Sequence, residues 1–167
     1  MHEIRSQKAT EAALQNLINQ VRDGYGDGTP LVVGIHTGGA WVATRLCEAL
    51  GWDEPATLDI SLYRDDFETN GLKRSGTTDR MPQQLNGENI LLIDDVLFTG
   101  RTVRAALNVL FDYGRPGAIN LGILFDRGGR ELPIEPTFLG ESLGEKGAGR
   151  CKLGGPEPLV LMTPDSE

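Results

Sequence analysis

Residues 90–102 have the sequence ILLIDDVLFTGRT, and this stretch decides the fold of the 167-residue chain. Its first four residues are all apolar, which indicates a strand with both faces covered, because a half-exposed strand alternates apolar and polar positions. Asp94 and Asp95 follow at the end of this strand, and a short loop with Thr99 and Gly100 leads into a helix that begins near Arg101. The stretch therefore predicts a buried strand, a polar loop and a helix in succession.

Strands and helices alternate on both sides of this stretch. Leu14, Leu17, Ile18 and Val21 fall at helical spacing and predict an amphipathic helix near the start of the chain. We expect further strands at residues 31–35, 57–63, 89–93 and 118–125, weaker ones at 137–139 and 159–162, and helices at 40–50 and from 101 to the turn before Pro116. This alternation predicts an α/β fold with a mainly parallel central sheet flanked by helices.

Composition narrows the classes of function. No apolar run approaches the roughly 20 residues that span a bilayer, and the polar N-terminus lacks the apolar stretch of a secretory signal, so we expect a cytoplasmic protein with no membrane partner. The formal net charge of -8 argues against broad nucleic-acid binding, which needs a basic face. Cys47 and Cys151 lie far apart and lack the spacing of a metal cluster or a disulfide framework.

Residues 64–87 interrupt the alternation. The segment is polar, contains Gly71, Gly76 and Pro82, and shows no sustained period. Loops of this length in compact domains are usually active-site lids or disordered insertions, and the sequence leaves both open.

The residues after the buried strand suit a phosphorylated sugar. Ligands of open α/β sheets bind at the carboxyl ends of the strands, and the free N–H groups at a helix start favour a phosphate. Thr99 and Thr102 can donate hydroxyl hydrogen bonds, and Gly100 allows close approach. Asp94 and Asp95 would repel a phosphate, but they can accept hydrogen bonds from sugar hydroxyls or hold Mg²⁺, mainly through water and substrate oxygens. The alternative, in which the carboxylates only cap the helix, leaves their place at the end of a buried strand unexplained.

This stretch resembles the signature of type I phosphoribosyltransferases that binds 5-phosphoribosyl diphosphate (PRPP): an apolar strand, two acidic residues and a Thr-Gly-x-Thr loop. Residues 34–39, 58–66, 100–107 and 126–134 resemble segments of the PyrR family. That branch combines uracil phosphoribosyltransferase activity with regulation of pyrimidine genes. The likeness runs from about Leu31 to Gly140.

The resemblance implies one domain of residues 1–167 with a type I phosphoribosyltransferase fold, a flexible loop 64–87 and a small C-terminal hood from about 126 to 167. It implies that uracil displaces diphosphate from PRPP and forms UMP, through an oxocarbenium-like transition state at ribose C1. Mg²⁺ is the implied cofactor. The implied catalytic residues are Asp94, Asp95 and Arg64, where the two carboxylates also hold the metal, mainly through water or substrate. A homodimer or higher homo-oligomer is expected by analogy.

The resemblance also assigns residues to the substrate. The turn at Thr37 and Gly38 would bind pyrophosphate, although the residues alone fit a plain glycine turn equally well. PyrR proteins usually carry Arg where this chain has Gly38, so one positive charge is missing. Tyr63 and Arg64 open the loop that in relatives closes over PRPP. The expected substrate-binding residues are Thr37, Gly38, Gly39, Tyr63, Val96, Leu97, Phe98, Thr99, Gly100, Arg101, Thr102, Phe138 and Leu139.

Phe98 bears on the choice of base. Enzymes of this superfamily that use 6-oxopurines carry at that position an Asp that contacts the purine N7, and Phe cannot make that contact. Uracil is therefore favoured over hypoxanthine. Phe138 and Leu139 correspond to hood residues that cover the base, although both fit a core strand nearly as well.

Two other functions stay open. One is a purine or xanthine phosphoribosyltransferase, which Phe98 disfavours. The other is a nucleotide- and RNA-binding regulator with little catalysis. Gly38 favours this alternative, because a positive charge toward the diphosphate is missing there. RNA binding is possible but expected to be weak, because relatives commonly carry His, Arg and Lys where this chain has Gly129, Glu135 and Glu141.

Overall fold

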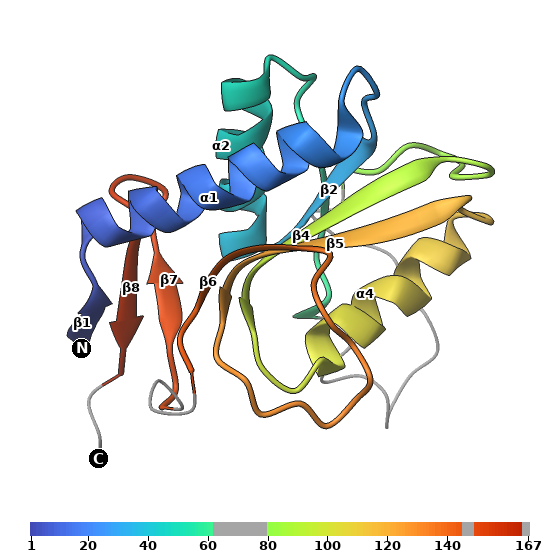
Figure 1. The fold of residues 1–167 in the computed structure, drawn as a ribbon. Helices are drawn as coiled ribbons and strands as arrows, with labels where there is room; N and C mark the ends of the chain where they lie inside the picture. The colour runs from blue at the N-terminus through green and yellow to red at the C-terminus, as the bar shows by residue number, and fades with distance from the viewer. Residues whose placement is uncertain (62–79, 145–148, 165–167) are drawn as a thin grey trace.

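The computed structural model describes residues 1–61, 80–144 and 149–164. Its centre is a five-stranded sheet in the order β3-β2-β4-β5-β6, in which every neighbouring pair is parallel (Figure 1). The strands are β2 (Leu31–Ile35), β3 (Ala56–Leu58), β4 (Asn89–Leu97), β5 (Ala118–Asp126) and β6 (Phe138–Ser142). A smaller antiparallel sheet has the order β1-β8-β7, with β1 (His2–Arg5), β7 (Lys152–Gly154) and β8 (Val160–Thr163).

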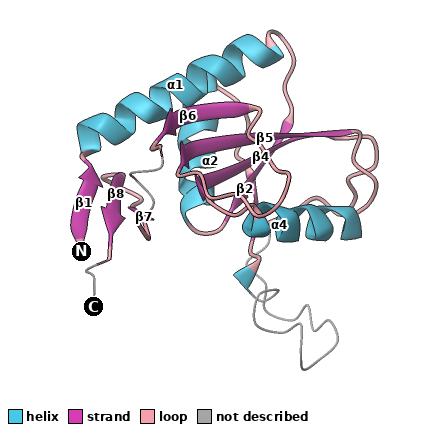
Figure 2. Ribbon diagram, turned by 60° about the horizontal axis from the view of Figure 1, so that its bottom comes forward, coloured by secondary structure: helices cyan, strands magenta, loops and turns pink. Residues whose placement is uncertain are grey.

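Helices lie on both faces of the parallel sheet. Helices α1 (Gln7–Tyr25) and α2 (Gly38–Leu50) cover one face, and α4 (Arg101–Asp112) covers the other (Figures 1 and 2). The predicted α/β class is confirmed. No helix in the described part of the chain is long and apolar enough to cross a bilayer.

Strand β4 is buried on both faces, as its apolar run predicts. Leu91 and Ile93 pack in the cluster formed with α1 and α2, whereas Ile90 and Leu92 pack in the cluster formed with α4. Successive side chains of a strand point to opposite faces, so one strand serves both halves of the core. Each such side chain contributes about 1.5–3 kcal/mol through burial. These contacts fix the end of β4, where the carboxylates lie.

Two glycines bring α2 close to the sheet. A Cβ on Gly34 would stand 2.7 Å from the Ala40 Cα, and one on Gly39 would stand 2.6 Å from the Ile93 carbonyl oxygen. Either side chain would push the helix away. The N-terminus of α2 is therefore held against β4.

The chain order places a ligand site between β2 and β4. After β2 the chain adds β3 on one side, and it then returns to add β4 on the other side. Ligands of open α/β sheets bind at the carboxyl ends of the strands where the order reverses. The residues after β2 and at the end of β4 meet at this point.

Two strand boundaries differ from those predicted. The strand expected at 57–63 ends at Leu58, because Asp59 Oδ1 accepts hydrogen bonds from the Ser61 N–H (2.9 Å) and hydroxyl (2.6 Å) in a local turn. The strand expected at 89–93 continues to Leu97, because β4 stays paired with β5 through residues 94–97. Both carboxylates are thus part of the strand and do not follow it.

Part of the segment expected to form the hood, residues 126–167, joins the parallel sheet. β6 is the fifth strand of that sheet, and the centre of its Phe138 ring lies 5.8 Å from that of the Tyr25 ring of α1. Phe138 of β6 packs against the main core, because the apolar face of α1 lies there. The small sheet instead combines β7 and β8 with β1 from the other end of the chain.

The expected loop 64–87 is described only from residue 80. Arg80 exchanges two backbone hydrogen bonds with Thr57 (3.0 and 3.2 Å), and Leu85 is fully buried. The Leu85 N–H donates to the Tyr113 carbonyl at 3.1 Å. Residues 80–87 therefore pack against the domain, and residues 64–79 of the expected loop lie outside the described residues.

Candidate functional site

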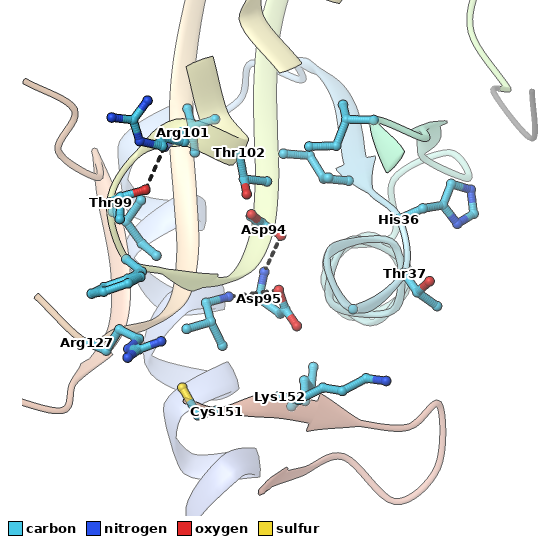
Figure 3. A pocket seen from close by; sticks show the side chains of 18 of the residues that line it. His36, Thr37, Asp94, Asp95, Thr99, Arg101, Thr102, Arg127, Cys151 and Lys152 are labelled. Atoms are coloured by element: carbon cyan, nitrogen blue, oxygen red, sulfur yellow. Dashed lines mark hydrogen bonds between the residues drawn. The ribbon is translucent and has the colours of Figure 1, made fainter. Parts of the chain in front are cut away.

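A cavity of about 650 Å³ lies where β2 and β4 end (Figure 3). Its walls come from the turn after β2, the end of β4 with the loop to α4, the residue after β5, and β7 of the small sheet. The lining residues are 35–38, Trp41, Ile60, Ser61, 94–103, Arg127 and 150–153.

Asp94 and Asp95 differ in burial. Asp94 is 5% exposed, and one of its oxygens accepts the Asp95 N–H at 2.9 Å. Asp95 is half-buried, and one of its oxygens accepts the Val96 N–H at 2.9 Å. Figure 3 shows Asp94 next to Thr102, and Asp95 on the side of Lys152. Both carboxylates line the cavity and could accept sugar hydroxyls or hold a cation.

The loop between β4 and α4 ends at the start of a helix. Gly100 is its N-cap with φ of 91°, a conformation that favours glycine, and it has no side chain to cap the helix. The Thr99 hydroxyl accepts the Arg101 N–H at 3.2 Å. The first N–H groups of a helix lack partners within the helix and favour an anion. Thr99 and Thr102 stand on either side of this helix start, as the sequence predicts.

The segment after β5 holds this loop in place. The N–H groups of Glu131 and Leu132 both donate to the Thr99 carbonyl, at 3.0 and 3.1 Å. The Arg101 guanidinium pairs with the Glu131 carboxylate at 2.7 Å. The loop that would receive a phosphate is thus fixed from outside the cavity.

Arg130 fastens the same segment. Its guanidinium donates to both Asp126 oxygens, at 2.8 and 2.6 Å, and also to the carbonyls of Phe98 (3.0 Å) and Ile134 (2.7 Å). The hydrogen bond from Arg130 lowers the pKa of Asp126, and the hydrogen bond to Asp126 raises the pKa of Arg130. Sequence reasoning did not identify this clamp, because it depends on how the chain folds back after β5.

The turn after β2 forms the opposite wall. The peptide bond between His36 and Thr37 is cis, and Thr37 is the N-cap of α2. Gly38 lies so close to Asp95 that a Cβ added to Gly38 would overlap the Asp95 carboxylate and stand 3.0 Å from the Asp95 Cβ. Position 38 therefore cannot carry a side chain while Asp95 keeps its place.

An aromatic ring and a cation form a further part of the wall. Phe98 is 41% exposed, and the Arg127 guanidinium lies 3.8 Å from its ring centre. A planar ring of this kind can stack on a base, and the guanidinium can donate to base oxygens. Sequence reasoning did not place Arg127 in the site.

The structure brings together most of the predicted residues. Thr37, Gly38 and all residues from 94 to 102 line the cavity, whereas Gly39 lies just behind it against β4. Tyr63 and Arg64 lie outside the described residues. Phe138 and Leu139 do not line the cavity, because they belong to β6, where they pack near α1 and α4 respectively.

No sequence pattern indicates that several of the lining residues belong to the site. Trp41 lies on α2, and Arg150, Cys151 and Lys152 reach the cavity with β7. Burial raises the pKa of Cys151. The tail shows no periodic pattern, so only the fold brings β7 to this place.

The fold and the site together define a phosphoribosyltransferase domain, and residues 1–140 match the family described as phosphoribosyl transferase domain. The chain belongs to the PyrR family. It is 53% identical over 133 residues to the bifunctional protein PyrR of Pseudomonas paraeruginosa strain PA7, covering 79% of this chain and 78% of that protein. It is 51% identical over 137 residues to the bifunctional protein PyrR of Pseudomonas fluorescens strain Pf-5, covering 81% and 82%.

Solved structures with little sequence similarity share the fold. A hypoxanthine-guanine phosphoribosyltransferase of Bacillus anthracis has a TM-score of 0.68 at 17% identity, covering 87% of this chain and 85% of that chain. A hypoxanthine-guanine-xanthine phosphoribosyltransferase has a TM-score of 0.68 at 15% identity, covering 98% and 94%. At sequence identities this low, the two similar structures establish the fold, but they do not show which base this chain uses.

Proposed function

We propose that this chain is a uracil phosphoribosyltransferase that forms UMP and diphosphate from uracil and PRPP. One observation carries the proposal: a single cavity joins the carboxylates of β4, the helix start after Gly100 and the turn at Thr37. These parts match the three parts of PRPP, namely its ribose hydroxyls, its 5-phosphate and its diphosphate.

The chemistry needs positioning and charge, and no protein nucleophile. The loop 99–102 binds the 5-phosphate through N–H groups and the Thr99 and Thr102 hydroxyls. Asp95, with Asp94 more deeply placed, lies beneath the ribose and stabilises the positive charge that develops as the bond at C1 breaks. The departing diphosphate leaves toward Thr37 and Gly38. Positioning uracil against C1 supplies much of the remaining rate enhancement.

Mg²⁺ fits this site as a metal whose ligands would come from both the protein and the substrate. Within the described residues, no cluster of three or more His, Cys, Asp and Glu side chains could hold a metal by itself. Mg²⁺ usually keeps several waters and binds through one or two carboxylates together with substrate oxygens. Asp94 and Asp95 are the residues that would hold it, and the bound ion would neutralise charge on the diphosphate.

Phe98 supports a pyrimidine base. Its ring offers a stacking surface and no carboxylate for a purine N7, and Arg127 beside it can donate hydrogen bonds to the carbonyl oxygens of uracil. A purine or xanthine phosphoribosyltransferase is the alternative within the same fold.

The relatives are called bifunctional, and we propose a regulatory role in pyrimidine biosynthesis beside catalysis, in a cytoplasmic homodimer or larger homo-oligomer. Weak RNA binding fits the charges of the described residues. Arg130 is bound by Asp126 and Glu135, and Glu141 is paired with Arg5 at 2.7 Å. Few free cations are left on the segment after β5.

Base competition tests the proposal. The purified chain is supplied with PRPP, Mg²⁺ and either uracil, hypoxanthine or xanthine, and the nucleotide product is separated and quantified. Uracil should give the highest kcat/KM by at least about tenfold, a difference of about 1.4 kcal/mol in transition-state binding. Preferential formation of a purine nucleotide would overturn the choice of base and leave the phosphoribosyltransferase assignment intact.

A further inference from the structure

Cationic side chains are unevenly distributed around the cavity. Within the described residues, the Arg and Lys side chains that line it are Arg101, Arg127, Arg150 and Lys152. Arg101 pairs with Glu131, and the Arg127 guanidinium lies over Phe98, so both belong to the wall formed by the β4–α4 loop and the segment after β5. Neither Arg101 nor Arg127 belongs to the wall at Thr37.

The turn at Thr37 contains no Arg or Lys. Position 38 is glycine, and a Cβ there would overlap the Asp95 carboxylate in its present conformation. The negative charge of Asp95 lies directly beside this turn. A group with several negative charges that binds here therefore needs a cation from another element, in addition to backbone N–H groups and any bound metal.

Among the described cations that line the cavity, we take Lys152 as the one that can provide it. It is the first residue of β7, where it pairs with Met162 of β8. Figure 3 shows its side chain extending from β7 on the side of the cavity where Thr37 lies. Lys152 is exposed, and no ion pair or hydrogen bond holds its ammonium group to another residue in the part of the chain that the structure describes. Its long stem can reach a ligand in the cavity.

The small sheet that carries Lys152 is firmly placed against α2. Leu153 and Leu161 are almost fully buried in the core cluster shared with α1 and α2. Gly155 follows β7 so closely against Trp41 of α2 that a Cβ there would stand 2.6 Å from the Trp41 ring. The position of the Lys152 backbone relative to the turn at Thr37 is therefore fixed by packing.

We infer that Lys152 is a binding residue for the diphosphate group of PRPP, and that it supplies from β7 the positive charge that Gly38 cannot supply from α2. This inference rests on the proposed function. It also predicts that the enzyme holds the product diphosphate, as well as PRPP, through Lys152, whereas UMP, which has no diphosphate, makes no use of it.

Binding measurements separate these ligands. Isothermal titration with Mg²⁺ gives the dissociation constants of PRPP, inorganic diphosphate and UMP for the wild-type chain and for Lys152→Met, which keeps the apolar stem and removes the charge. Lys152→Met should weaken PRPP and diphosphate binding by about threefold to tenfold, the range expected for a partly exposed charge pair. UMP affinity should stay within twofold. Lys152→Arg should recover most of the affinity for PRPP.

Lys8→Met is the matched control, because it removes the same charge from an exposed position on α1 that does not line the cavity. It should leave all three dissociation constants unchanged. Equal weakening of UMP and PRPP by Lys152→Met, unchanged binding of all three ligands, or a higher KM for uracil alone would each overturn the inference. A wild-type chain that binds no PRPP at all would overturn the proposed function as well, so the two failures are distinguishable.

Discussion

At the scale of single residues, the two adjacent carboxylates of β4 have different surroundings. Asp94 is buried and accepts the Asp95 N–H, so its loss affects packing as well as chemistry. Asp95 is half-buried and faces the cavity beside Gly38. Asp95 therefore offers the cleaner test of the proposed role beneath the ribose.

Asp95→Asn should lower kcat by about a hundredfold, because it removes the negative charge that stabilises the transition state. The Asn side-chain oxygen can still accept the Val96 N–H, so the fold should persist. Steady-state kinetics beside thermal unfolding checks both parts. A variant that unfolds readily but keeps full activity per folded molecule would reject the assignment of Asp95.

Thr99→Ala and Thr102→Ala should each raise the KM for PRPP about tenfold or more, because a hydrogen bond to a charged group contributes about 1.5–3 kcal/mol. Thr99→Ala also removes the acceptor of the Arg101 N–H. Thr99→Ser and Thr102→Ser keep the hydroxyl and serve as controls. An unchanged KM in both Ala variants would count against the loop as the phosphate site.

The sequence predicts the part of the site whose functional residues follow one another closely in the chain. Asp94, Asp95, Thr99 and Thr102 follow a recognisable strand, so their shared location follows from the strand alone. Arg127 was visible only as a surface charge, because its contact with Phe98 depends on how the chain turns after β5. Gly128 and Gly129 indicate a turn after β5, but they do not indicate which residues the turn brings together.

At the scale of elements, the segment after β5 supports the β4–α4 loop through the Asp126–Arg130 clamp. Both side chains are largely buried, at 14% and 16% exposure, and the guanidinium also holds two carbonyls. Removing one partner of such a pair leaves an uncompensated charge. The clamp should therefore contribute to stability as well as to the shape of the site.

Asp126→Asn should lower the free energy of unfolding at pH 7 by about 2–4 kcal/mol. Arg130 lowers the pKa of Asp126 below its ordinary value of 3.8, so the stabilising contribution is fully present above pH 3.8 and is lost as the pH falls through the lower folded value. The difference between wild type and variant should thus be constant from pH 7 to pH 5 and shrink below pH 3.8. Urea unfolding at each pH measures it.

Glu54→Gln is the control for this experiment, because Glu54 pairs with Arg80 where both side chains are about two-thirds exposed. Its effect should stay within about 0.5 kcal/mol at every pH. A difference for Asp126→Asn that grows toward acid pH would contradict the clamp.

Sequence reasoning found β4 and α4 through their long apolar patterns, and β6 and β8 as weaker strands. It missed β1 and β7, which are four and three residues long and carry mixed polar residues. Such short strands form because the small sheet closes between the two ends of the chain, a contact that no local pattern encodes. The same limit explains β6, whose strand character was visible but whose partner was not.

At the scale of the whole molecule, charge decides which partners fit. The chain carries a formal net charge of -8, and Arg130 of the segment after β5 is already engaged by Asp126. Each phosphate contact that a protein lacks forfeits the release of bound counterions. An RNA partner therefore meets an unfavourable surface at this segment.

RNA binding should accordingly be weak. A mobility-shift titration against the leader RNA of the organism's own pyrimidine genes, at near-physiological salt with uridine nucleotide, should show no sequence-specific complex at nanomolar protein. Glu135→Arg with Glu141→Lys should strengthen binding, because both changes turn repulsion into phosphate contacts. Tight, specific binding by the wild-type chain would show that another surface recognises RNA.

We propose that phosphoribosyl transfer to uracil takes place in the cavity between β2 and β4. Its most direct test follows UMP and diphosphate together, from labelled uracil, PRPP and Mg²⁺, with the wild-type chain and with Asp95→Asn. We predict that the wild-type chain releases both products in equal amounts and that Asp95→Asn slows both by the same factor. A folded wild-type chain that binds PRPP but forms no UMP, or a full rate in Asp95→Asn, would contradict the account.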